Sequence, residues 1–507
     1  MSRRRFLGGL VAASAIGTAA LGAPRVQTLD RRARQKQQWD LIVLGAGTAG
    51  MPAAIFAAQA GARVLVIEAT AVTGGTLDRS TGQLSASGTV WQRARGIEDS
   101  PDAHYADHMR INNWSSDPAL TRLFVDEAPE TLNWLAASGF QIVEGDPVKG
   151  KGHDPFTVAR YQNGPERGRS ILKAMQPLFD AAVASGRVVV KFETEAAELI
   201  QDGSGAVVGV LTESGGRQRE EHFGARVLIA TGGCAANPSL FQDLHGTALT
   251  TLSARPSSKG HGLLLAQAAG GYLRGGEKYV PLYGGLLESD TAPSMLDASF
   301  RHDPGSRPPW EIHVNARGER FVQEDNPGHE YREHALARQP GHRLWVVGDS
   351  EILQKAPPFV SRWSAEKVMK AFDDAHPMFS RADTLSTLAM RAGIDPGGLR
   401  RSTAQYNDAL VAGTPDPFGR THRPLPIAKP PFFAVRMTGW TVFSFAGIAV
   451  DTSLRVLRHD GAAVPNLYAA GEAIGGAATS GNAYTNGSVL TPALAFGRLA
   501  GRRAMTR

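Results

Sequence analysis

Residues 40–50 read DLIVLGAGTAG, and residues 63–68 read RVLVIE. Each apolar run has the length of a buried parallel strand, and the small residues between the runs predict a helix. In this setting Gly45 allows a tight turn, Gly47 lets a diphosphate approach the backbone, and Gly50 lets the helix pack on the strand. The helix N-terminus adds unpaired N–H groups that attract phosphate. The stretch therefore predicts a βαβ unit that binds a dinucleotide.

An acidic residue follows this unit, and two later segments indicate which dinucleotide it binds. Glu68 ends the second strand, where its carboxylate can accept hydrogen bonds from ribose hydroxyls. A predicted strand at 226–230 runs into a Thr-Gly-Gly turn, and residues 467–472 read LYAAGE, similar to the C-terminal flavin segment in which the acid binds the ribityl or pyrophosphate region. These segments favour FAD over NAD. Since the glycine pattern does not recur, no built-in NAD(P)H domain is expected.

Two further stretches carry a resemblance to a known superfamily: VNARGERFVQE at 314–324 and PALAFGRLAG at 492–501. With the N-terminal motif and LYAAGE, they resemble the fumarate reductase/succinate dehydrogenase flavoproteins and the 3-ketosteroid Δ1-dehydrogenases over residues 38–507. The resemblance implies an α/β fold, in which a Rossmann-type FAD-binding domain carries an inserted α+β cap domain. It also implies a small-molecule substrate between the domains, an external electron carrier or acceptor, and hydride transfer between flavin N5 and a carbon next to a carbonyl or carboxylate.

The chain is expected to divide into four segments. These are a twin-arginine signal peptide with a polar linker at 1–37, a first part of the FAD-binding domain at 38–276, a proline-dense cap at 277–435, and a second part of the FAD-binding domain at 436–507. Residues 188–190 and 207–211 are expected to be strands of one small sheet. The length of 507 residues suits two domains.

The N-terminus accounts for the whole of the positive net charge. SRRRFL at 2–7, followed by an apolar, small-residue stretch, resembles the signal read by the twin-arginine export machinery, so we expect a periplasmic or exported protein. The alternative is a basic tail before a short anchor helix. Residues 1–36 carry eight basic side chains and one acid, whereas the whole chain has a net charge of +6. Because the excess lies in the leader, nucleic-acid binding is not expected.

Cysteine content narrows the redox chemistry. Cys234 is the single cysteine, so an intrachain disulfide, a c-type haem attachment and an iron–sulfur cluster are all excluded. No metal site is expected. The loop 74–88 contains no histidine, whereas succinate dehydrogenases attach FAD through one, so the FAD is expected to be non-covalent.

The residues expected to contact FAD come from the glycine turn, the loop after Glu68, the later strand ends and the start of the last helix. That helix is expected to open at 488–490 and to stabilise negative charge on reduced flavin. The full set is Gly45, Gly47, Thr48, Ala49, Gly50, Glu68, Gly74, Gly75, Thr76, Ser80, Thr81, Gly82, Ala196, Thr231, Gly232, Gly233, Glu472, Ser488 and Leu490.

Candidate catalytic residues follow from the resemblance. Tyr484 stands where fumarate reductases have an arginine that clamps a carboxylate. A phenol can donate one hydrogen bond to a carbonyl but cannot form a bidentate fork, which resembles the ketosteroid enzymes. The alternative is a packing tyrosine. Arg332 is the nearest match to the arginine proton donor of fumarate reductases, His329 or Tyr331 could serve instead, and an arginine at the surface of a helix start is equally compatible.

Two residues earlier in the chain, His153 and Tyr161, are further candidates to line the cleft, although a structural role suits each of them as well. Two alternative functions stay open. One is a carboxylate-type α,β-reductase driven by an external carrier, and the other is a flavin-free protein that keeps the fold to bind a partner.

Overall fold

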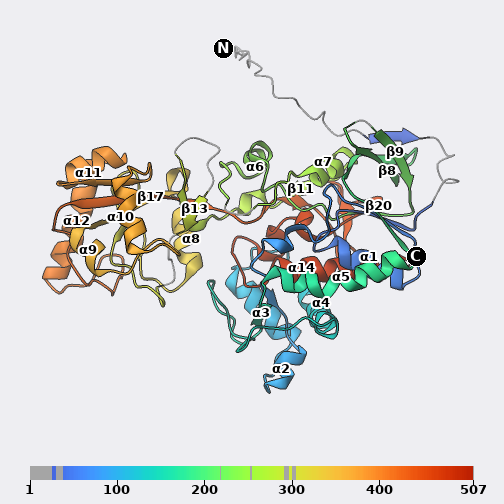
Figure 1. Cartoon of the computed structure of the whole chain (residues 1–507), viewed down its shortest axis with the longest axis horizontal. Helices are drawn as coiled ribbons and strands as arrows, with labels where there is room; N and C mark the ends of the chain where they lie inside the picture. The colour runs from blue at the N-terminus through green and yellow to red at the C-terminus, as the bar shows by residue number, and fades with distance from the viewer. Residues whose placement is uncertain are drawn as a thin grey trace, which may run out of the picture.

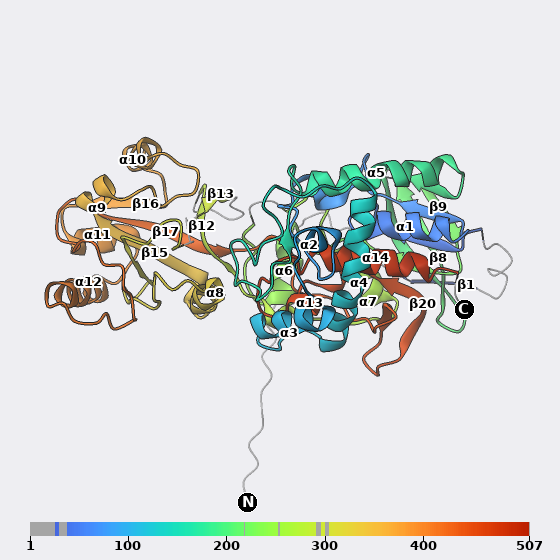
Figure 2. The same ribbon diagram turned by 90° about the horizontal axis from the view of Figure 1, so that it is seen from below.

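The computed structural model describes residues 26–29, 38–216, 218–251, 254–289, 296–299 and 304–505, which form two lobes side by side along the long axis (Figures 1 and 2). The predicted twin-arginine segment lies outside the described residues. Within the predicted linker, Val26–Leu29 form strand β1, which pairs in parallel with β7 (Thr194–Asp202). The linker prediction was therefore wrong for these residues, because they gain backbone partners at the edge of a sheet.

The larger lobe is built on a six-stranded sheet whose order is β19-β20-β10-β2-β3-β6. The strands are β19 (Arg455–Leu457), β20 (Ala463–Ala469), β10 (Val227–Ile229), β2 (Leu41–Leu44), β3 (Val64–Ile67) and β6 (Val188–Lys191). All neighbouring pairs are parallel except β19 with β20. Every residue of β2 and β3 is buried, as apolar runs in a covered parallel sheet require.

Strand β6 corrects one prediction. It pairs with β3 in the parallel sheet, whereas β8 (Val207–Ser214) belongs to a four-stranded sheet of order β1-β7-β8-β9 with β9 (Gln218–Phe223). Residues 188–190 and 207–211 therefore do not share a small sheet. The physical reason is the crossover through α5 (Gly168–Ala184), which returns the chain beside β3. The four-stranded sheet contacts β20, β10 and β3.

Helices α1 (Gly50–Gln59), α5, α14 (Leu490–Arg502) and α4 (Pro118–Ala137) form a connected layer on the large sheet (Figure 1). Small residues set the spacing between α1 and α14. A Cβ atom at Gly497 would lie 2.1 Å from the Ala49 carbonyl oxygen, and one at Gly501 would lie 2.4 Å from that of Ala53. The C-terminal helix is thus held against the helix that follows the glycine turn.

The remaining elements of this lobe are short connections around the sheet. They are η2 (Gly75–Asp78), β4 (Leu84–Ser85), α2 (Val90–Ala94), α3 (Pro101–Ile111), β5 (Tyr161–Gln162), α6 (Pro238–His245), α7 (His261–Ala268), β11 (Leu273–Arg274), η3 (Gly276–Lys278), β18 (Gly447–Ile448), η5 (Gly471–Ile474) and α13 (Ala477–Ser480). Among the described residues, no helix is both long and apolar enough to cross a membrane.

The smaller lobe is the inserted α+β cap, and it has a hydrophobic core of its own. Its antiparallel sheet runs β13-β12-β17-β15-β14, with β16 also paired to β17. The strands are β12 (Leu282–Leu287), β13 (Leu296–Ser299), β14 (Ile312–Val314), β15 (Arg343–Asp349), β16 (Phe379–Ala382) and β17 (Phe432–Trp440). The helices are α8 (His329–Ala337), η4 (Pro340–His342), α9 (Ser350–Lys355), α10 (Ala365–Asp373), α11 (Leu385–Ala392) and α12 (Pro396–Val411).

The motif at 314–324 folds as a buried ion-pair network in the cap. The Arg320 guanidinium donates to Glu324 at 2.7 Å and to Asp416 at 2.7 Å, and all three side chains are fully buried. Burial alone would raise the pKa of Asp416, but Arg320 together with the backbone N–H groups of Phe418 and Arg420 lowers it overall. The network ties the chain before α8 to a residue almost a hundred positions away.

A small apolar cluster lies where the lobes meet. It contains Leu282 and Trp440 from the cap strands together with Phe443, Phe445, Ala477 and Tyr484. Because β17 continues directly into residues 441–447, the cap sheet and the second part of the FAD-binding domain share this cluster.

Candidate cofactor and active site

The glycine turn after β2 has the geometry that its sequence predicts. Gly45 has a left-handed φ of +101°, and a Cβ atom there would lie 2.6 Å from the Ala230 carbonyl oxygen. A Cβ at Gly50 would lie 1.8 Å from the Gly45 carbonyl oxygen. A Cβ atom added at Gly47 would lie 3.5 Å from the Gly75 Cα atom, which is an ordinary contact distance. Among the described residues no side chain caps α1. The Met51 N–H donates to the Gly47 carbonyl oxygen at 3.0 Å and Pro52 has no N–H, so the N–H groups that can meet a ligand are those of the turn 47–50.

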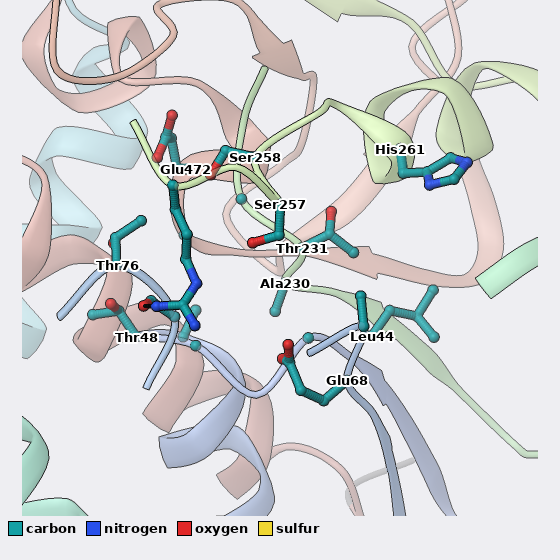
Figure 3. A pocket seen from close by; sticks show the side chains of 18 of the residues that line it. Leu44, Thr48, Glu68, Thr76, Ala230, Thr231, Ser257, Ser258, His261 and Glu472 are labelled. Atoms are coloured by element: carbon teal, nitrogen blue, oxygen red, sulfur yellow. Dashed lines mark hydrogen bonds between the residues drawn. The ribbon is translucent and has the colours of Figure 1, made fainter. Parts of the chain in front are cut away.

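A cavity of about 340 Å³ lies over this turn (Figure 3). It brings together many of the predicted cofactor residues: Gly45, Gly47, Thr48, Ala49, Glu68, Gly75, Thr76, Ala196, Thr231, Gly232, Glu472 and Leu490. Figure 3 shows Glu68 and Glu472 on either side of the space. Two acids that are far apart in the sequence thus share one cavity.

Both carboxylates accept hydrogen bonds from other residues of the FAD-binding lobe. Glu68 accepts hydrogen bonds from the Ala46 N–H at 2.8 Å and from the Thr70 hydroxyl at 2.7 Å. Glu472 accepts from the Ser444 N–H at 3.0 Å, and burial raises the pKa of its carboxyl group. These contacts orient each acid and leave both in the wall of the cavity.

One lining hydroxyl provides a direct test of fit. The Thr231 Oγ1 atom is buried and has no hydrogen-bond partner within the part of the chain that the structure describes. Buried polar atoms in native proteins are nearly always bonded, so this atom requires a ligand or a water molecule. The residues present therefore suit a polar, phosphate-containing dinucleotide.

Other predicted cofactor residues do not line the cavity: Gly50, Gly74, Ser80, Thr81, Gly82, Gly233 and Ser488. Gly233 packs against Glu472, which lines the cavity: a Cβ atom at Gly233 would lie 2.5 Å from a carboxylate oxygen of Glu472. A Cβ at Gly82 would lie 2.4 Å from the Arg167 backbone. The Ser488 hydroxyl donates to the Thr485 carbonyl at 2.7 Å, one residue before the Val489 cap of α14.

Sequence reasoning missed several lining residues, chiefly the loop 255–259 together with Thr194, Glu195 and His261. Arg255 donates to Asp78 at 2.9 Å and to the Gly75 carbonyl oxygen, which joins this loop to η2. The loop has no hydrophobic period that could have marked it. The usable signal was topological, because loops beyond the carboxyl ends of parallel strands line ligand crevices in such sheets.

Tyr484 lies in the apolar cluster between the lobes. Its hydroxyl donates to the Val280 carbonyl oxygen at 3.1 Å and lies 3.4 Å from the Thr441 hydroxyl. Burial, with a smaller contribution from Tyr279, raises the pKa of Tyr484 well above that of a free phenol. The side chain is therefore neutral over the physiological range and can donate a hydrogen bond.

The other candidates on the cap come from α8. The ring of His329 lies 6.2 Å from that of His153, and its backbone N–H donates to Asp154 at 3.2 Å. Arg332 is 1% exposed, and its guanidinium carbon lies 5.9 Å from the centre of the Tyr283 ring. The structure thus brings His329 next to the FAD-binding lobe, whereas Arg332 is buried beside Tyr283 of the cap core and is not at the surface.

Two carboxylic acids, Glu330 and Glu333, are neighbours of Arg332 in the sequence of α8. Burial, strengthened by Asp154, raises the pKa of Glu330 to about 10. Burial also raises the pKa of Glu333 to about 8, although Arg332 opposes that shift. Both groups therefore favour their neutral forms near pH 7, which reduces the negative charge that faces the lobe interface.

Tyr161 occupies a different place. It belongs to a small apolar cluster with Ile111 and Phe156, and the Lys151 ammonium lies 5.8 Å from the centre of its ring. Burial raises the pKa of Tyr161 to about 12. The side chain has the packing environment of a structural tyrosine.

The fold and cavity together define a dinucleotide-binding flavoprotein. Residues 40–488 match the family described as FAD binding domain, and the chain belongs to that family. It is similar to a fumarate reductase (cytochrome) of Shewanella frigidimarina, with 28% identity over 92% of this chain and 76% of that protein. It is also similar to a vinyl phenol reductase of Lactiplantibacillus plantarum, with 28% identity over 92% of this chain and 96% of that protein.

A solved structure supports the fold independently. The 3-ketosteroid Δ1-dehydrogenase of Sterolibacterium denitrificans superposes with a TM-score of 0.72 at 19% identity, covering 92% of this chain and 99% of that chain. The cofactor of the present chain is FAD, and the chain is an FAD-dependent oxidoreductase. The flavin-free alternative is not supported.

Proposed function

We propose that the cavity over the glycine turn holds FAD without a covalent bond, and that the substrate meets it at the junction between the lobes. When bound, FAD supplies a flavin N5 that accepts or donates hydride at a carbon next to a carbonyl or carboxylate. The observation that carries the proposal is the shared cavity of Glu68 and Glu472. The N–H groups at the start of α1 would bind the diphosphate, and the two carboxylates would bind the sugar and ribityl hydroxyls.

Proton handling is proposed for residues on both sides of the junction. Tyr484, as a neutral phenol, would turn its single O–H from the Val280 carbonyl oxygen to a substrate carbonyl, and would supply or retain the matching proton. Arg332, from α8, would instead bind a substrate carboxylate or serve as the proton donor. His329, whose backbone N–H donates to Asp154, would assist either role from the same helix.

Two substrate types follow from these two residues. A ketosteroid-like substrate needs one donor to a carbonyl, which Tyr484 offers, whereas a carboxylate reductase needs a cation, which Arg332 offers. The relatives include an enzyme named for fumarate, a dicarboxylate, which fits the second type. We favour the carbonyl type, because the cluster around Tyr484 is made of aromatic and aliphatic side chains.

We also propose that the chain is exported by the twin-arginine machinery and works in the periplasm with an external electron carrier or acceptor. Residues 2–7, SRRRFL, support the export step. The twin-arginine route carries folded proteins, which suits an enzyme that acquires its cofactor before export.

Anaerobic reduction of the flavin by a panel of ketosteroids, saturated carboxylates and hydroxy acids tests this proposal, with reoxidation by enones and enoates as the reverse arm. Loss of ketosteroid turnover in Tyr484→Phe, with enoate turnover retained, would establish the carbonyl type. The converse result in Arg332→Gln would establish the carboxylate type. A wild-type protein that contains FAD but exchanges hydride with neither group would refute the proposal.

A further inference from the structure

The last residue of α6, His245, contacts a loop that serves both the cofactor cavity and Tyr484. Its Nε2 atom accepts hydrogen bonds from two consecutive backbone N–H groups, those of Phe445 and Ala446, each at 3.1 Å. Its Nδ1 atom lies 2.9 Å from the Phe241 carbonyl oxygen and donates to it. Only the neutral imidazole with its proton on Nδ1 can make all three bonds.

The segment 444–446 has two functional connections. Ser444 donates its backbone N–H to Glu472 at 3.0 Å, and its hydroxyl accepts from the Cys234 N–H at 3.1 Å. The next residue, Phe445, packs edge-on against Tyr484 with ring centroids 5.6 Å apart. A small displacement of this segment would therefore move a cofactor ligand and the wall of the substrate site together.

We propose that His245 is a positioning residue: as a neutral acceptor it holds 444–446 so that Glu472 faces the cofactor and Phe445 supports Tyr484. The proposal rests on the assignment of Glu472 to the FAD site. Phe445 and Ala446 are buried, so their N–H groups have no access to water if the acceptor is lost. Protonation of His245 would place a third N–H against the two donors and release the segment.

The surroundings of His245 favour the neutral form. Burial lowers the pKa of its imidazole. Phe241 stacks on the ring at 4.0 Å, and Tyr279, a neutral phenol, packs against it at 5.6 Å. The other titratable or charged groups face it across a neighbouring cavity of about 560 Å³, and they are Glu277, His342, Arg343 and Arg436.

The test measures the release of FAD from the purified full-length holoenzyme, monitored by flavin fluorescence after dilution, between about pH 7.5 and about pH 4.5. The range extends well below the ordinary histidine pKa because burial lowers that of His245. In His245→Phe the FAD dissociation constant should rise on the order of tenfold at the upper pH, because two buried donors lose their acceptor. In His245→Gln an amide oxygen can replace Nε2 without titrating, so affinity should recover and the increase in dissociation at acid pH should be smaller than in the wild type.

His342→Gln is the matched control, since His342 lines the same cavity and burial lowers its pKa as well, yet it makes no bond to 444–446. It should keep the wild-type pH profile. Wild-type affinity in His245→Phe, or an unchanged pH profile in His245→Gln, would overturn the proposal. A wild-type protein that binds no FAD at any pH would overturn the cofactor assignment as well, and that result is distinct from a defect confined to the His245 variants.

Discussion

The imidazole of His153 stacks on the ring of Tyr484, with centroids 5.8 Å apart and an angle of 13° between the planes. His153 comes from a loop of the FAD-binding lobe, and its ring also lies 6.2 Å from His329 of the cap. The stack therefore connects the proposed proton-handling phenol to the helix that carries Arg332. Proton transfer and cap position are expected to be coupled at this contact.

Tyr484→Phe should lower the rate of substrate-dependent flavin reduction by about 10²- to 10⁴-fold, the usual contribution of a general acid or base. FAD content should not change, because the hydroxyl contacts Val280 and Thr441 rather than the cofactor cavity. Stopped-flow reduction by a ketosteroid measures the rate. Tyr272→Phe, far from this cluster, is the control. Full activity in Tyr484→Phe would remove the residue from the mechanism.

Glu68→Ala should weaken FAD binding by about tenfold to a hundredfold, since hydrogen bonds to a charged acceptor are the strong ones. Part of the lost affinity should come from the turn at Ala46, because the Ala46 N–H donates to Glu68 and would lose its acceptor. Titration of the apoprotein with FAD gives the dissociation constant. Glu98→Ala removes an exposed carboxylate elsewhere and should bind FAD as the wild type does. Equal affinities in the two variants would contradict the proposed ribose contact.

Gly50→Ala should yield protein with little bound FAD, because the added methyl group would lie 1.8 Å from the Gly45 carbonyl oxygen and must displace the turn or the helix. Gly203→Ala is the matched control, since nothing lies within 4 Å of a Cβ there. The ratio of flavin to protein absorbance after purification distinguishes them. A yellow Gly50→Ala protein with normal flavin content would show that the turn tolerates a side chain and would contradict the proposed diphosphate site at this turn.

Asp416→Asn should destabilise the cap by about 3–5 kcal/mol at neutral pH, because it leaves part of the Arg320 charge buried without its partner. The pKa of Asp416 is lowered in the fold, so its contribution to stability is complete above the ordinary aspartate pKa and is lost as the pH falls through the lowered value. Thermal melting of both proteins should therefore differ most near pH 7 and converge in acid. A constant difference at all pH values would show that the charge of Asp416 is not responsible.

Much of the FAD-binding lobe was predictable from local patterns. The turn at Gly45, the helix after it and the strand that ends at Glu68 are contiguous, so their spacing alone predicts a dinucleotide cradle. Strand β6 was misplaced because an apolar run carries no information about which strand it will pair with. The loop 255–259 escaped notice for a related reason, since its place in the cavity depends on where two distant strands end.

The order of residues along the chain was thus enough for the cofactor class, because diphosphate recognition uses backbone N–H groups within a single βαβ unit. It was not enough for the proposed substrate site, whose parts come from a loop at 153–154, helix α8 and the turn that holds Tyr484. Their approach depends on how the cap packs against the larger lobe, a long-range contact that leaves no periodic mark in the sequence. Packing within the cap likewise made Arg332 a buried cation beside Tyr283 instead of a surface residue.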